Sequence, residues 1–139
     1  MKNKLIFWTV AALFLSLLLT ACAEETAGPP VSSLSVELSE FKFTPAKMSV
    51  YANQEITIQL SNNGSLPHDF TILKPGAVAA TPFDPQKQKE DILYNFSIDP
   101  QAAVTQKFTL PTPGEYNVIC IVPGHVESGM TAKITAVNP

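Results

Sequence analysis

The chain has 139 residues, of which 45% are hydrophobic and 15% charged, and its formal net charge is −3 at pH 7. Its nine basic residues are all lysines and form no basic stripe, which excludes the phosphate-binding surface of a nucleic-acid-binding protein. Twelve prolines and several glycine-bearing turns favour a β protein over one built from long helices.

Residues 1–21 predict an export signal. Lys2 and Lys4 form a charged start, and an almost wholly apolar run from Leu5 to Leu19 follows, which is the order of a secretory signal. The run ends in Leu19-Thr20-Ala21-Cys22, which resembles the bacterial lipobox. The resemblance implies cleavage before Cys22 and lipidation of that cysteine. The alternatives are a single transmembrane helix and an ordinary signal with an incidental cysteine.

Cleavage at that point divides the rest of the chain into two parts. Residues 22–33 form the lipidated cysteine and a flexible tether, because they are acidic, contain proline and lack apolar periodicity. Residues 34–139 form one domain. Without Lys2 and Lys4, seven lysines face twelve acids, a net charge of −5. Cys120 then lacks a disulfide partner outside the cytoplasm, so it is either a buried small hydrophobe or a metal ligand.

From Leu34 onward, apolar residues alternate with polar ones over short runs, as expected for half-buried strands. Turn signals such as Ser61-Asn-Asn-Gly-Ser65 separate the runs. About seven short strands with turns roughly every ten residues predict an all-β Greek-key sandwich or barrel. The predicted runs cover 34–38, 41–43, 48–50, 56–60, 68–73, 104–110, 116–120 and 131–137.

Residues 74–100 interrupt this rhythm, and the segment is too long for a structureless connection in a compact domain. Asp84-Pro85 has the pattern of a helix N-cap followed by proline at the first helical position. Ile92, Leu93 and Phe96 then lie at helical spacing. We therefore predict one short helix near residues 86–95.

The segment from Cys120 to Met130, CIVPGHVESGM, places a thiol, an imidazole and a thioether at equal intervals. Each residue alone has a commoner explanation, since Met130 suits a core and His68 a surface or capping position. Together, however, two imidazoles, one thiolate and a distant methionine sulfur are the donors that suit both oxidation states of copper. Pro123-Gly124 favours a type II turn that returns His125 toward Cys120. The sequence therefore predicts a copper site.

Gly114-Glu-Tyr-Asn-Val-Ile-Cys120, followed by Pro-Gly-His125 and Gly-Met130, resembles the ligand loop of the cupredoxins, the small blue copper proteins. The gaps are most similar to those of auracyanin-type members, whereas azurins and plastocyanins differ in one gap. The resemblance implies one copper ion, alternating between Cu²⁺ and Cu⁺ in a type 1 site. It makes His68, Cys120 and His125 the strong ligands and Met130 the weak axial ligand.

Two positions depart from the family pattern. Many cupredoxins have asparagine after the first histidine and serine or threonine after the cysteine, and hydrogen bonds between these places help to hold the thiolate. This chain has Asp69 and Ile121 instead. The surroundings of the thiolate are therefore built differently, and an additional charge at Asp69 is expected to lower the reduction potential.

The resemblance implies a monomeric electron carrier and not an enzyme, since copper oxidases and nitrite reductases need histidines beyond the two present. We expect lipid anchoring at the extracytoplasmic face of a bacterial membrane, and partners such as membrane cytochromes, oxidases or reaction centres. An exposed edge of His125 would meet them through a small apolar patch. Copper delivery or storage and a metal-free adhesion module are the alternatives. The patch consists of Leu66, Pro67, Val122, Pro123 and Val126.

Overall fold

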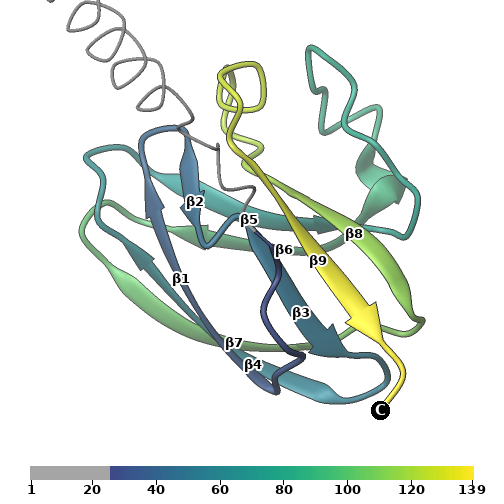
Figure 1. Ribbon diagram of the computed structural model, residues 1–139. Helices are drawn as coiled ribbons and strands as arrows, with labels where there is room; N and C mark the ends of the chain where they lie inside the picture. The colour runs from purple at the N-terminus through teal and green to yellow at the C-terminus, as the bar shows by residue number, and fades with distance from the viewer. Residues whose placement is uncertain (1–25) are drawn as a thin grey trace, which may run out of the picture.

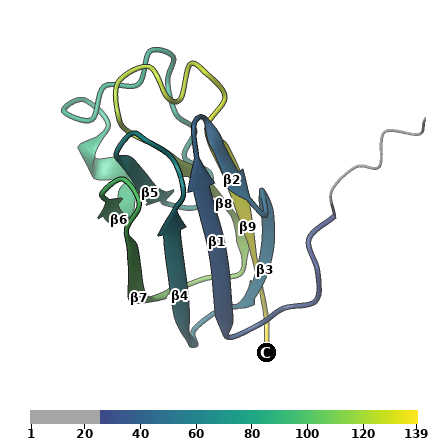
Figure 2. The ribbon, with the colours of Figure 1, turned by 90° about the vertical axis from the view of Figure 1, so that its left-hand side faces the viewer.

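Two β-sheets lie face to face as the two layers of the protein (Figures 1 and 2), which a computed structural model describes over residues 26–139. The predicted export signal and Cys22 lie outside the described residues. The predicted all-β sandwich is confirmed, with almost no helix. Between residues 26 and 139, no helix has the length and apolar character needed to cross a bilayer.

The first sheet has the strand order β2-β1-β4-β7. Strand β1 runs parallel to β4, with Val36 opposite Leu60, whereas the β1–β2 and β4–β7 pairs are antiparallel. The parallel pair brings together strands that are not consecutive in the chain, as in a Greek key. The strands of this sheet are β1 (Ser33–Ser39), β2 (Lys42–Thr44), β4 (Glu55–Asn62) and β7 (Ala103–Thr109).

The second sheet has the order β3-β9-β8-β5-β6. Strands β3 and β9 are parallel, and the other neighbours are antiparallel. The central neighbours β5 and β8 are joined by the pairs Thr71–Ile119 and Ile72–Val118. The strands are β3 (Lys47–Tyr51), β5 (His68–Leu73), β6 (Ile92–Ile98), β8 (Gly114–Ile119) and β9 (Thr131–Val137).

The core lies between the two sheets because alternate side chains of each strand point to the same face. In β1, β4 and β9, every second residue is buried, as the alternation predicted. Burying one apolar face of each sheet provides the main driving force for folding. The largest completely buried side chains include Leu38, Phe43, Ile56, Phe70, Leu110 and Tyr116.

The folded domain begins a few residues earlier than the sequence predicted. Val31 pairs with Val50, and its N–H donates to the carbonyl of Ser49 at 3.0 Å. The carbonyl of Ser32 likewise accepts a hydrogen bond from Thr57. Residues 31–33, assigned above to the tether, therefore belong to the sandwich.

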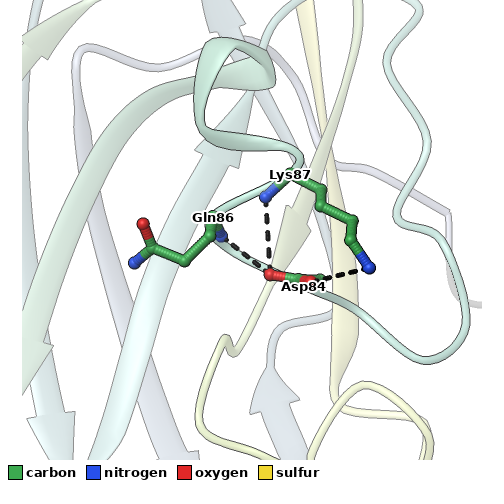
Figure 3. A network of polar contacts seen from close by, with 3 residues as sticks. All are labelled: Asp84, Gln86 and Lys87. Carbon is green, nitrogen blue, oxygen red and sulfur yellow. Dashed lines mark hydrogen bonds and ion pairs between the residues drawn. The ribbon is translucent and has the colours of Figure 1, made fainter.

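The helix predicted near residues 86–95 forms only in part. The Asp84 carboxylate does begin a turn, since it accepts hydrogen bonds from the N–H groups of Gln86 (3.0 Å) and Lys87 (3.4 Å) and forms an ion pair with the Lys87 amine (Figure 3). A three-residue 3-10 helix, η1 (Lys89–Asp91), follows, and strand β6 begins at Ile92.

The prediction of helix was wrong from Ile92 onward because these residues pair with β5. Tyr94 lies opposite Ile72 and Phe96 opposite Phe70. Aromatic side chains fit a half-buried sheet well, whereas a helix of about ten residues is marginal without extensive packing. A tertiary partner distant in sequence therefore decided the conformation of this segment.

A buried hydroxyl fixes the turn between β7 and β8. The Tyr116 hydroxyl donates to the Thr112 carbonyl at 2.7 Å and accepts from the Thr112 N–H at 3.2 Å. We expect Tyr116→Phe to lower the free energy of unfolding by about 1–2 kcal/mol, because two backbone groups lose their partner. Urea denaturation would measure the change. Tyr51→Phe is the matched control, since the Tyr51 hydroxyl has no hydrogen bond within residues 26–139, and an equal effect in both variants would contradict this assignment.

Candidate metal centre

Two neighbouring strands and one loop bring the predicted ligands to one end of the sandwich. His68 is the first residue of β5, and Cys120 directly follows β8. Because β5 and β8 pair side by side, these two residues meet across the sheet although they are far apart in sequence. His125 lies on the loop between β8 and β9, and Met130 directly precedes β9. Figure 1 shows this loop projecting from the end of the sandwich.

The loop has the two bends that its glycines predict. The His125 N–H donates to the carbonyl of Val122 at 3.0 Å, and Gly124 between them has a φ of 85°, which confirms the type II turn. Gly129 has a φ of 88° at the second bend. Both backbone conformations are costly for residues with a Cβ atom.

Met130 closes the loop through its backbone. Its N–H donates to the carbonyl of His125 at 2.9 Å, and its carbonyl accepts from the Cys120 N–H at 3.2 Å. The Met130 side chain is completely buried. The three loop residues that the sequence predicted as ligands are thus held to one another by main-chain hydrogen bonds.

The three strong donors form a small triangle. His68 Nδ1 and His125 Nδ1 lie 3.2 Å apart, and the Cys120 sulfur lies 3.3 Å from His125 Nδ1 and 3.9 Å from His68 Nδ1. Three donors bonded to one central ion at about 2.0–2.3 Å in a trigonal plane would be separated by about 3.5–4.0 Å. The observed sides are close to these values, so the donor set fits a first-row metal ion between them. Within residues 26–139, His68, Cys120 and His125 are the cluster suited to a metal.

Burial favours the neutral forms of His68 and Cys120. His68 is 1% exposed, Cys120 is completely buried and His125 is 5% exposed. Burial raises the pKa of the Cys120 thiol, which the backbone amides of Asp69 and Val122 oppose. Burial, followed by the nearby His125, lowers the pKa of His68. A buried thiolate therefore needs a positive ion beside it, and a metal bound in the triangle supplies one.

Asp69 contributes to the sulfur environment through its backbone. The Asp69 N–H donates to the Cys120 sulfur at 3.3 Å. Its carboxylate turns instead to β6, where it accepts a hydrogen bond from the Ser97 hydroxyl at 2.5 Å. Asp69 therefore hydrogen-bonds to the sulfur through its backbone and to another strand through its side chain.

The second ring nitrogen of His68, Nε2, is unusual in its lack of a hydrogen-bond partner among the described residues. Metal-bound histidines generally donate their other ring N–H to a carbonyl, carboxylate or water. His68 Nε2 is buried and has no hydrogen-bond partner among the described residues. The orientation of this ring therefore depends on its burial and on the pairing of His68 with Ile98 in the sheet.

The apolar residues around the ligands differ in exposure. Leu66 is 41% exposed, and Pro67 and Pro123 are also exposed, whereas Val122 and Val126 are half-buried. His125 is 5% exposed, so only a small part of this residue reaches solvent beside the patch.

Sequence reasoning missed Phe41, whose ring contacts His125 edge-to-face with 5.2 Å between the ring centroids. It was assigned to a strand together with Phe43. The sequence did contain a signal for the turn. Leu38 and Phe41 are three residues apart, so they break the alternation of a continuous strand.

Comparisons with known proteins agree with this geometry. The family profile described as cupredoxin-like domain matches residues 9–136. Auracyanin-A of Chloroflexus aurantiacus is 26% identical over 113 residues, which cover 71% of this chain and 70% of the relative. The solved structure of that auracyanin, described as a "blue" copper protein, has a TM-score of 0.59 at 25% identity and covers 76% of this chain and 99% of its own.

Two further structures share the fold. Reduced auracyanin of Roseiflexus castenholzii has a TM-score of 0.68 at 22% identity, covering 78% of this chain and 98% of that chain. A multi-copper oxidase of Pediococcus acidilactici has a TM-score of 0.55 at 14% identity, covering 87% of this chain but 29% of the oxidase. His68, Cys120, His125 and Met130 are arranged as a type 1 copper site. The chain belongs to the cupredoxin-like domain family.

Proposed function

We propose that this protein is a type 1 blue copper protein that carries single electrons between redox partners. The observation that carries the proposal is the buried triangle of His68, Cys120 and His125, whose donor atoms already lie within 3.2–3.9 Å of one another. Copper bound there would supply the chemistry by alternating between Cu²⁺ and Cu⁺. The auracyanin relative described as a blue copper protein supports the same activity.

The residues of the site suit electron transfer because they resist movement. His68 belongs to a central strand, and the β8–β9 loop is closed by hydrogen bonds between Cys120, Met130 and His125. Donors held in place by a packed framework move little when the charge of a bound ion changes, which keeps the barrier to electron transfer low. Burial also excludes water from the donors.

An electron carrier fits this chain better than an enzyme does. The chain has two histidines, and both lie in the triangle, so a second, catalytic copper would lack imidazole ligands. The likeness to a multi-copper oxidase extends over 29% of that protein, and at 14% identity it reflects the fold alone.

We further propose that the domain is tethered to the extracytoplasmic face of a bacterial membrane. Cys22 would carry the lipid, and the residues after it would let the domain, a monomer, reach membrane partners such as cytochromes, oxidases or reaction centres. A single acyl chain binds a membrane only marginally, whereas the bacterial lipoprotein pattern that this N-terminus resembles supplies several chains.

The partner would dock on the apolar patch of Leu66, Pro67, Val122, Pro123 and Val126. The first two directly precede His68, and the other three flank His125 in the β8–β9 loop. Because the Nδ1 atoms of His68 and His125 lie 3.2 Å apart, both groups of patch residues lie beside the same site. Weak electron-transfer contacts use small interfaces of this kind.

The colour of the copper-loaded protein tests the proposed function. We expect an intense blue absorption band from the thiolate–copper(II) bond, and Cys120→Ser should abolish it because the thiolate is lost. Met48→Leu is the control, since Met48 is a buried methionine of the core outside the ligand set, and it should leave the band unchanged. A protein that stays colourless after full oxidation and releases copper readily to a chelator would instead be a copper-delivery protein.

A charge placed in the patch should slow contact with a partner. We expect Val122→Lys to reduce the rate of electron transfer to a soluble cytochrome c by at least about threefold, because a lysine there costs desolvation in an apolar contact. Stopped-flow absorbance measures the rate. Val31→Lys serves as the control, since Val31 precedes β1 and pairs with Val50, at the end of the sandwich away from the ligand loop. Loss of the blue band in Val122→Lys would count against the patch as a docking surface.

The charge of Asp69 should lower the reduction potential. Its carboxylate acts electrostatically on both His68 and Cys120, and a negative charge stabilises the more positive Cu²⁺ form. Asp69→Asn should therefore raise the midpoint potential by an amount on the order of tens of millivolts. Glu37→Gln, which removes a charge from an exposed position of β1, controls for net charge. Equal midpoint potentials in Asp69→Asn and wild type, measured by voltammetry, would exclude this role.

A further inference from the structure

Phe41 covers the histidine that the docking patch surrounds. Its ring meets the His125 ring at 84°, with 5.2 Å between the centroids, so the two side chains are in edge-to-face contact. His125 itself is 5% exposed, whereas Phe41 is 43% exposed. The aromatic ring therefore touches the ligand on one side and solvent on the other.

The backbone at Phe41 is unfavourable for an aromatic residue. Phe41 has a φ of 61° in the two-residue turn between β1 and β2, where Ser39 pairs with Lys42. Glycine or asparagine is the usual residue in this left-handed region because a bulky side chain crowds the backbone. Such a conformation persists only where the surroundings hold it, and it is often associated with function.

A carboxylate clamp holds this turn against the loop that leads to His68. The Glu40 carboxylate accepts hydrogen bonds from the Ser65 N–H at 2.5 Å and the Ser65 hydroxyl at 2.9 Å. A Cβ atom on Gly64 would lie 2.7 Å from a Glu40 oxygen, so glycine permits this close approach. The hydrogen bond from the Ser65 N–H is the main cause that lowers the pKa of Glu40 to about 2, so the carboxylate stays charged even at a pH where an ordinary glutamate takes up a proton.

The clamp joins the two segments on either side of the site. The turn at residues 40–41 carries the cover of His125, and the loop at residues 63–67 leads into His68. A further hydrogen bond, from the Asn63 N–H to the Leu38 carbonyl at 2.8 Å, joins the same segments. Figures 1 and 2 show the β1–β2 turn at the end of the sandwich from which the ligand loop projects.

We propose that electrons pass between His125 and a partner through the ring of Phe41, which the Glu40–Ser65 clamp holds in place. The same ring shields His125 from water. The proposal rests on the function proposed above and identifies Phe41 as the residue that a redox partner would contact. An electron leaving His125 crosses either an aromatic ring in contact with it or a gap filled with solvent. The path through the ring has a shorter through-space gap than the path through solvent. The ring also keeps water away from His125.

The first experiment uses the metal-free protein and needs no electron transfer. Diethyl pyrocarbonate modifies accessible imidazoles, and mass spectrometry distinguishes the peptides of His125 and His68. In Phe41→Ala, we expect modification of His125 to become at least about threefold faster, while His68, 1% exposed, serves as the internal reference. Phe41→Leu should stay close to wild type because it keeps an apolar cover. An unchanged rate in Phe41→Ala would overturn the shielding role.

The second experiment measures electron self-exchange between oxidised and reduced copies of the copper-loaded protein by NMR line broadening. Phe41→Ala should slow the exchange at least about threefold while the blue band keeps its wavelength. Phe41→Leu should give an intermediate rate, and Val31→Ala, which precedes β1 and is paired with Val50 away from the site, should match wild type. An equal or faster exchange in Phe41→Ala would show that electrons leave without the ring and would overturn the proposal.

A third variant tests the clamp. Glu40→Gln weakens the hydrogen bonds to Ser65 and should change both readouts in the same direction as Phe41→Ala, whereas Glu37→Gln should not. Wild-type behaviour of Glu40→Gln in both readouts would remove the clamp from the proposal. A wild-type protein without a blue band would refute the proposed function, whereas the modification of His125 would still report on the cover.

Discussion

The site depends on burying a sulfur and two imidazoles beside one another. Neighbouring strands β5 and β8 place His68 against Cys120, and the turn at Gly124 returns His125 to the same point. Removal from water disfavours a thiolate, and two backbone amides oppose this effect only in part. A cation between the donors would stabilise the thiolate further. The framework thus creates a position whose electrostatics favour a bound metal ion.

One end of the sandwich concentrates the features that matter for function. Three connections meet there: the β1–β2 turn, the loop before His68 and the β8–β9 loop. Hydrogen bonds from Ser65 to Glu40 and from Met130 to His125 tie their members together. Because each connection is fixed to a strand of a packed core, the donor atoms, the cover of His125 and the apolar surface keep a common arrangement.

The departures from the family pattern change how the site is supported and leave its donors in place. Asp69 keeps its main-chain hydrogen bond to the sulfur and sends its carboxylate to Ser97 on β6. Ile121 directly follows Cys120 and has no hydroxyl to offer the sulfur. The Asp69 carboxylate, a negative group near the ligands, is therefore bound to β6, an edge strand that the sequence pattern did not predict.

Local patterns in the sequence were sufficient for the sandwich, for most strands and for the four predicted ligands. Alternation in β1, β4 and β9 and the Pro-Gly turn before His125 depend on residues close together in the chain. Strand β6, the Glu40 clamp and Phe41 over His125 were decided only by the tertiary structure. Each depends on contacts between segments that are distant in the chain. A local pattern of apolar residues does not indicate which distant residue a side chain will contact.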